Sequence, residues 1–183
     1  MTKKVLSLTC LTLLMAHCVV CQPKSLVVKR AESSMTYRLV HPLHKIEATS
    51  KEVNYRLEAD AHAKKINSVT AEVDVISFDS GNSNRDSHAM EVIDAITFPE
   101  ASFSSTSIVQ NGDSLNVAGK LTFHGVTRDI QIPTAPIWSE NGLRVVGEFA
   151  VSLTDYKIER PSLLFIPVGD TLRFSFVAVF DKQ

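Results

Sequence analysis

The stretch KLTFHGVTRDIQI, residues 120–132, decides the fold because it places a chain reversal between two alternating apolar segments. Leu121 and Phe123 alternate with polar residues before Gly125, and two isoleucines resume the alternation after it. A period of two is typical of a half-buried strand, and glycine gives the chain the freedom to turn sharply. The stretch therefore predicts two antiparallel strands that are joined at Gly125.

The same stretch holds His124, Arg128 and Asp129 within six residues, which is also the composition of a catalytic cluster. A histidine base paired with Asp86 or Asp129 would need a nucleophile. The sequence has no Gly-x-Ser-x-Gly signature to supply one. The turn explains the proximity of these residues without a reaction, so we predict no catalytic residues and no enzyme.

Five segments repeat the strand pattern. Apolar and polar residues alternate in VNYRLEADAH (53–62), VTAEVDV (69–75), SLNVAGKLTF (114–123), LRVVGEFAVSL (143–153) and LRFSFVAVF (172–180). Asn-Gly pairs in QNGDS and SENGL accept the positive φ angles of tight hairpins. A sheet with this many strands has to close or stack to hide its apolar face, so we expect an antiparallel all-β barrel or sandwich.

One segment, residues 80–99, breaks the strand pattern. Ser83 with Asp86 three residues later resembles a capping box, apolar residues follow at helical spacing, and Pro99 ends the run. We predict a short helix near residues 84–95, lying on the barrel wall or across one end.

The first 21 residues have the pattern of a secretory signal peptide. Lys3 and Lys4 precede an uncharged run that is too short for a spanning helix, which needs about 20 apolar residues. A cut after Cys21 is favoured over one after Cys18, and lipid attachment at either cysteine is an alternative. We predict a signal peptide at 1–21, one domain at 22–183, and a periplasmic or secreted protein.

Composition excludes several classes of function. A cut after Cys21 removes every cysteine, and with them any disulfide or thiolate metal site. The six histidines are spread along the chain, and His41 and His44, the only close pair, are better explained by a surface turn. With Lys3 and Lys4 gone, 20 acidic residues outnumber the basic ones, and the net charge is near −3. We predict no metal, no cofactor and no nucleic-acid binding.

The polar segment NRDSHAM, residues 84–90, has two interpretations. In one, Arg85 pairs with a carboxylate and Asp86 caps the helix, which attaches the helix to the barrel. In the other, Arg85 and His88 stand at a cavity mouth and contact the polar head of an amphiphile. The two interpretations are compatible.

The order of these motifs resembles the YceI-like family of exported bacterial lipocalin-like proteins. The resemblance covers roughly residues 66–135, and the segment ERPSLLFIPVGD before the last strand departs from it. The matching residues are Arg85, Asp86 and His88; Phe98, Pro99, Ala101 and Phe103; Gly119, Leu121 and Thr122; and Gly125, Val126 and Thr127.

The resemblance implies an extended eight-stranded antiparallel barrel around an elongated apolar cavity. It implies as ligand a polyisoprenoid, a quinone-like molecule or another long-chain lipid. The alternatives are a stress-related structural barrel without ligand and a histidine-dependent hydrolase or isomerase. Transient membrane contact and a dimer are left open. The residues expected to contact the ligand are Arg85, His88, Met90, Phe98, Phe103, Phe123, Phe149, Phe165, Phe174 and Phe176.

Overall fold

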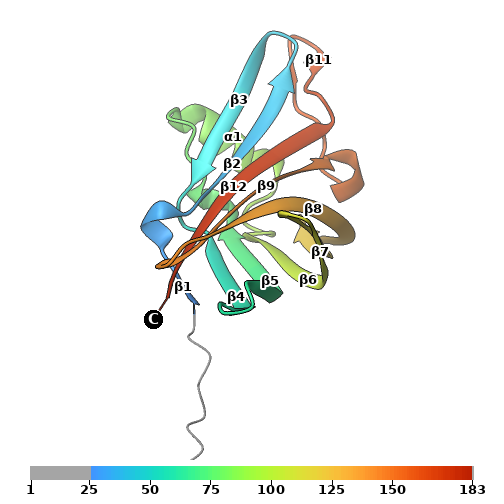
Figure 1. Cartoon of the computed structure of the whole chain (residues 1–183). Coiled ribbons are helices and arrows are strands. Elements are labelled where there is room, and N and C mark those ends of the chain that lie inside the picture. Colours follow the sequence, from blue (N-terminus) through green and yellow to red (C-terminus); the bar gives the residue numbers. More distant parts are fainter. Residues whose placement is uncertain (1–25, 183) are drawn as a thin grey trace, which may run out of the picture.

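The computed structural model describes residues 26–182 as a strongly curled antiparallel sheet with one α-helix (Figure 1). The predicted signal peptide lies outside these residues. The helix α1 spans Ser83–Val92, and 3₁₀ turns occur at Arg30–Glu32, Val75–Ser77 and Thr154–Tyr156. The strands are β1 (Leu26–Val28), β2 (Ser34–His41), β3 (His44–Ser50), β4 (Asn54–Asp60), β5 (Lys65–Asp74), β6 (Glu100–Asn111), β7 (Ser114–Phe123), β8 (Val126–Trp138), β9 (Gly142–Ser152), β10 (Ser162–Leu163), β11 (Ile166–Pro167) and β12 (Thr171–Lys182).

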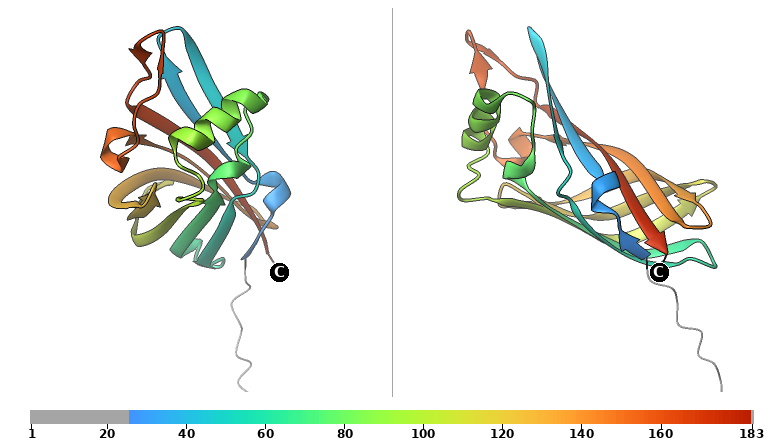
Figure 2. Two further views of the ribbon diagram at one scale, coloured as in Figure 1. Left: turned by 180° about the vertical axis from the view of Figure 1, so that it is seen from behind. Right: turned by 90° about the vertical axis from the view of Figure 1, so that its left-hand side faces the viewer.

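The main sheet has ten strands, not eight. Its order is β3-β2-β12-β9-β8-β7-β6-β5-β4, with β1 paired to β12, and β10 and β11 form a separate small hairpin. The end strands β3 and β4 do not pair with each other. Instead, Thr49 of β3 exchanges two backbone hydrogen bonds with Asp79, just before α1. The sheet is therefore a barrel opened along one side, and both ends of the described chain lie at the end away from α1 (Figure 2). The predicted all-β antiparallel class with one short helix is confirmed.

All five predicted strand segments fall in strands, and the 120–132 stretch forms the β7–β8 hairpin. Both turn residues, His124 and Gly125, have positive φ, as a two-residue hairpin of this twist requires. Gly112, in the turn between β6 and β7, also has positive φ. The turn in SENGL differs, because neither of its Asn-Gly residues has positive φ. Gly142 is needed there for another reason, since a Cβ atom would overlap the carbonyl oxygen of Phe180.

The helix lies across one end of the barrel (Figure 2). Its N-cap is Asn82 and not Ser83, because the Asn82 side chain accepts a hydrogen bond from the Arg85 N–H at 3.1 Å. Asp86 accepts from the Ser80 N–H at 3.2 Å, so it closes the preceding turn and not a capping box. On the inner side, Met90 packs on the barrel core near this end.

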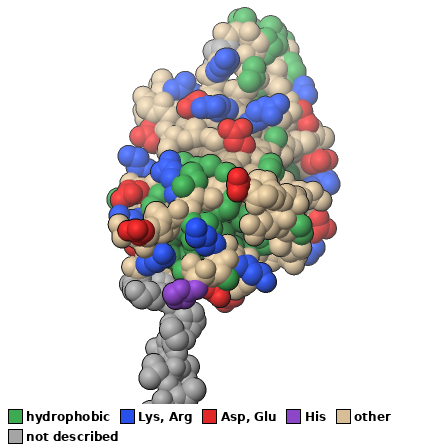
Figure 3. All heavy atoms as spheres, in the orientation of Figure 1, with side chains coloured by type: hydrophobic (Ala, Val, Ile, Leu, Met, Phe, Trp, Pro, Cys, Tyr) green, Lys and Arg blue, Asp and Glu red, His purple; other side chains and the backbone are tan. Residues whose placement is uncertain are grey.

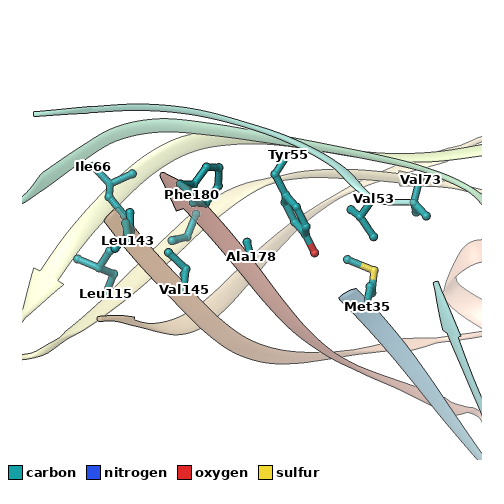
Figure 4. Close-up of a cluster of buried hydrophobic side chains, with 11 residues drawn as sticks. Met35, Val53, Tyr55, Ile66, Val73, Leu115, Leu143, Val145, Ala178 and Phe180 are labelled. Atoms are coloured by element: carbon teal, nitrogen blue, oxygen red, sulfur yellow. The ribbon is translucent and has the colours of Figure 1, made fainter. Parts of the chain in front are cut away.

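The core consists of two clusters of buried side chains, from the strands and from the segments that connect them. The cluster far from the helix is drawn in Figure 4 and includes Leu143, Val145 and Phe180. The other cluster, nearer the helix, includes Phe123 and Tyr156. Among residues 26–182 no helix is long and apolar enough to cross a membrane.

Candidate ligand cavity

A cavity of about 230 Å³ occupies the inside of the curled sheet. Its wall is almost entirely apolar because the inward-facing row of every long strand carries hydrophobic side chains. Helix α1 contributes the lining at one end. Representative wall residues from different strands are Leu39, Leu57, Val69, Leu121, Ile132 and Leu172.

Two glycines in the inward rows give aromatic rings room to pack close to the sheet. A Cβ atom on Gly119 would overlap the ring of Phe103, and one on Gly147 would lie 2.7 Å from the ring of Phe176. Any larger residue would push these rings toward the centre of the barrel. The glycines therefore widen the cavity, a positional role that glycine has in strands.

Aromatic rings concentrate toward the helix end of the cavity. Phe149 and Phe174 are direct partners in the β9–β12 pair and stack with centroids 4.9 Å apart. The ring centroid of Tyr37 lies 6.5 Å from that of Phe174 and 5.4 Å from that of Phe78. Burial, followed by the negative charge of Asp86, raises the pKa of the Tyr37 hydroxyl, so this wall stays uncharged.

The polar rim of the cavity comes from the start of α1. Arg85 donates to the Ser80 hydroxyl from Nε at 2.8 Å and to the Ser80 carbonyl from Nη2 at 3.0 Å. The predicted pairing of Arg85 with a carboxylate is thus replaced by bonds that attach the helix to the preceding turn. His88 also lines the rim; its side chain is 66% exposed and lies 3.6 Å from the Glu91 carboxylate.

Eight of the ten residues expected to contact a ligand lie in the cavity wall or rim. They are Arg85, His88, Met90, Phe103, Phe123, Phe149, Phe174 and Phe176.

The structure places the other two expected residues, Phe98 and Phe165, outside the cavity. Phe98 packs on His124 with ring centroids 4.5 Å apart and covers the Gly125 turn. Phe165 is 100% exposed at the tip of the β10–β11 hairpin. Residue type alone overestimates the lining set, because an aromatic residue in a turn obeys no strand alternation.

The cavity also contains aromatic residues that were not proposed as ligand contacts, chiefly Tyr37 and Tyr55. The sequence already indicated that Tyr55 faces inward, because the alternation in VNYRLEADAH puts it on the same face as Leu57. The signal was present for Tyr37 as well, because Tyr37 and Leu39 alternate with the polar residues Thr36 and Arg38.

His124, Arg128 and Asp129 of the 120–132 stretch do not converge on one site. His124 Nδ1 bonds to the Tyr156 carbonyl at 2.9 Å, Arg128 Nη2 lies 3.4 Å from the Asp155 carboxylate, and Asp129 pairs with Lys120. The contacts of His124 and Arg128 attach the β7–β8 hairpin to the 3₁₀ turn Thr154–Tyr156, whereas the Asp129–Lys120 pair lies within the hairpin. Among the described residues, no group of three or more metal-ligating side chains is placed to hold a metal ion.

Comparison with known proteins places this geometry in a family. The YceI-like domain matches residues 26–180. The UPF0312 protein of Vibrio campbellii is 35% identical over 99 residues, which are 49% of this chain and 52% of that protein. Protein YceI of Salmonella newport is 26% identical over 133 residues, 68% of this chain and 70% of that protein. The chain spans about half the length of the Vibrio relatives it matches.

Solved structures share the fold. Burkholderia cenocepacia BcnA superimposes with a TM-score of 0.76 at 24% identity, covering 83% of this chain and 98% of that chain. A polyisoprenoid binding domain from Saccharophagus degradans superimposes with a TM-score of 0.65 at 12% identity, covering 87% and 99%. The family match over nearly all of the described residues, together with this fold, shows that the chain belongs to the YceI-like family.

Proposed function

We propose that this protein is an exported carrier that holds one long-chain lipid, such as a polyisoprenoid, in its cavity without covalent chemistry. The observation that carries the proposal is the almost wholly apolar wall of the cavity. Each methylene moved from water into such a wall contributes about 0.8 kcal/mol. The description of the Saccharophagus domain as polyisoprenoid-binding supports the same class of ligand.

The head group of the lipid would lie at the rim formed by α1. Arg85 directs two donors to Ser80, so its main role is to position the helix. His88 is exposed beside the opening and is the side chain we propose to contact the head group.

Membrane contact is proposed at an apolar tip beside this rim. The tip consists of exposed side chains from the β2–β3 and β10–β11 hairpins, and Figure 3 shows hydrophobic residues gathered there. Two hydrogen bonds join these parts of the chain. The Gly169 N–H donates to the Val40 carbonyl, and His41 Nε2 bonds to the Ile166 carbonyl. The apolar tip comprises Val40, Leu43, Leu164, Phe165 and Ile166.

The apolar tip adjoins the cavity along the chain. Leu39 and Pro161 line the cavity. The residues that follow them, Val40 and Ser162, already belong to the β2–β3 and β10–β11 hairpins. Insertion of Phe165 into a bilayer would bring the rim to the lipid surface, so that a lipid tail could enter without crossing water. Large exposed apolar groups of this kind mark interaction sites on soluble proteins.

Lipid binding is tested by native purification, organic extraction and mass spectrometry of the extract. Leu57→Trp, which fills the cavity, should abolish retention of lipid, whereas Arg56→Trp on the outer face of the same strand should leave it unchanged. A wild-type protein that retains nothing and takes up no lipid from vesicles would indicate the ligand-free structural barrel instead. Turnover of the extracted lipid would indicate the histidine-dependent enzyme.

Membrane contact is tested by co-sedimentation with phosphatidylcholine vesicles. Replacing Leu164 and Phe165 by serine should release the protein from the vesicles and slow lipid uptake. Val109→Ser removes an exposed apolar side chain near the far end of β6 and is the matched control. Equal sedimentation of all three proteins would refute the membrane role of the apolar tip.

Export is tested separately by determining the N-terminal mass of the protein recovered outside the cytoplasm. A mature chain beginning at Gln22 is expected. A chain that keeps Met1, or one that carries lipid on a cysteine, would contradict the proposed processing.

A further inference from the structure

Two hydroxyl groups are buried in the apolar interior of the barrel. Tyr55 on β4 is 5% exposed and Thr134 on β8 is 7% exposed, and both line the cavity. Neither Tyr55 Oη nor Thr134 Oγ1 has a hydrogen-bond partner among residues 26–182. Buried hydroxyls are normally paired, because an unpaired one loses its bonds to water without replacement.

Both residues lie near Phe176. Thr134 is directly opposite Gly147 in the β8–β9 pair, and Gly147 is directly opposite Phe176 in the β9–β12 pair. From β4, the ring of Tyr55 approaches the ring of Phe176, with the two centroids 6.3 Å apart. Figure 4 shows the Tyr55 hydroxyl directed into the interior, between Ala178 and Met35.

The surroundings select an uncharged partner. The charged rim residues belong to α1, and Glu72 is in the outward row of β5, where it accepts a bond from Asn54. A charged group near Phe176 would be buried without a counter-charge, which is strongly unfavourable. Burial also raises the pKa of Tyr55, so its hydroxyl keeps the proton that it would donate.

We propose that the cavity binds an oxygenated neutral lipid, with a carbonyl oxygen that accepts hydrogen bonds from Tyr55 and Thr134. A carbonyl oxygen has two lone pairs and no charge, which matches two hydroxyl donors in an apolar wall. This inference rests on the proposed lipid-carrier function and narrows its ligand. A pure hydrocarbon tail in this place would leave both hydroxyls unpaired, and a purely structural barrel would have no need of them.

The test compares two probes loaded from vesicles: a long-chain dialkyl ketone and the alkane of equal length. Wild-type protein should prefer the ketone, and its carbonyl stretching band should move to lower frequency than in a hydrocarbon solvent. Tyr55→Phe and Thr134→Val remove one hydroxyl each and keep the shape. Each should reduce the preference for the ketone by about fivefold to tenfold without weakening alkane binding.

Tyr156→Phe is the matched control, because Tyr156 Oη is also buried without a partner among the described residues but does not line the cavity. It should leave the ketone preference unchanged. If wild-type protein binds neither probe, the carrier function itself fails. If it binds both equally, or if the band does not move, the carrier function stands and this inference is wrong. The band shift needs only wild-type protein, so a variant that fails to fold does not remove the test.

Discussion

The ring of Phe176 on β12 packs against Gly147, its direct partner on β9, so that a Cβ atom at position 147 would meet the ring at 2.7 Å. Phe103 on β6 packs against Gly119 on β7 in the same way. Two large rings thus lie against the sheet and not across the cavity. The width of the cavity therefore depends on two positions that contribute no side chain to it.

Gly147→Ala should push the Phe176 ring into the cavity and reduce lipid retention. Overpacking of this kind costs about 1–3 kcal/mol of stability. Adding Phe176→Leu to Gly147→Ala should restore retention because the smaller side chain makes room for the new methyl group. Retention is measured by mass spectrometry of extracts and stability by denaturant unfolding. Full retention in the single variant would show that the ring does not limit the cavity.

Arg85→Ala should destabilise the protein by about 1–2 kcal/mol, because two hydrogen bonds between α1 and Ser80 are lost. His88→Ala should leave stability nearly unchanged, since that side chain is mostly exposed, but should weaken lipid retention. Thermal unfolding and lipid extraction separate the two effects. If both variants match the wild type in stability and retention, neither residue acts at the rim.

His124→Ala should lower stability by about 1–2 kcal/mol and leave lipid retention intact. The substitution removes the bond to the Tyr156 carbonyl and the packing on Phe98. It also puts alanine at a positive φ of 48°, which asparagine tolerates better. His124→Asn is therefore the control for backbone strain and should be the milder change. Lipid turnover that disappears in a folded His124 variant would instead support the enzymatic alternative.

Acid should weaken the junction between β9 and β12 through Asp170. Hydrogen bonds from Ser152 and Thr154 lower the pKa of its carboxyl group to about 2. A lowered pKa in the folded state means that the ionised form stabilises the fold above the ordinary pKa of 3.8. This stabilisation is lost as the pH falls from about 4 toward 2.

Asp170→Asn should be less stable than the wild type at neutral pH and should lose less stability between pH 4 and pH 2. Denaturant unfolding at a series of pH values measures both effects. Asp129→Asn, at an exposed carboxylate paired only with Lys120, is the comparison and should leave the acid dependence unchanged. Parallel pH profiles for wild type and Asp170→Asn would contradict the assignment.

The strands β4, β5, β7, β8, β9 and β12 were predictable because they depend on local alternation, whereas β2, β3 and β6 were not predicted. The SLNVAGKLTF segment is β7 from end to end, and its reversal at Gly125 was visible in the sequence. The helix was predictable from the helical spacing of apolar residues before Pro99, but its cap was not. Asn82 and Ser83 are both good caps, and the choice depends on the local fold that directs Asp86 to Ser80.

The sequence by itself determined which residues alternate, where the chain turns, and that an apolar face has to be enclosed. The tertiary structure decided which aromatics face the cavity, because that depends on how far the sheet curls and on the register between distant strands. Phe123 and Phe165 illustrate this difference: one ends an inward row and is buried, and the other occupies a hairpin tip and is fully exposed. The partnership of Phe176 with Gly147, and the position of Tyr55 and Thr134 near Phe176, likewise arise only when strands far apart in the sequence come together.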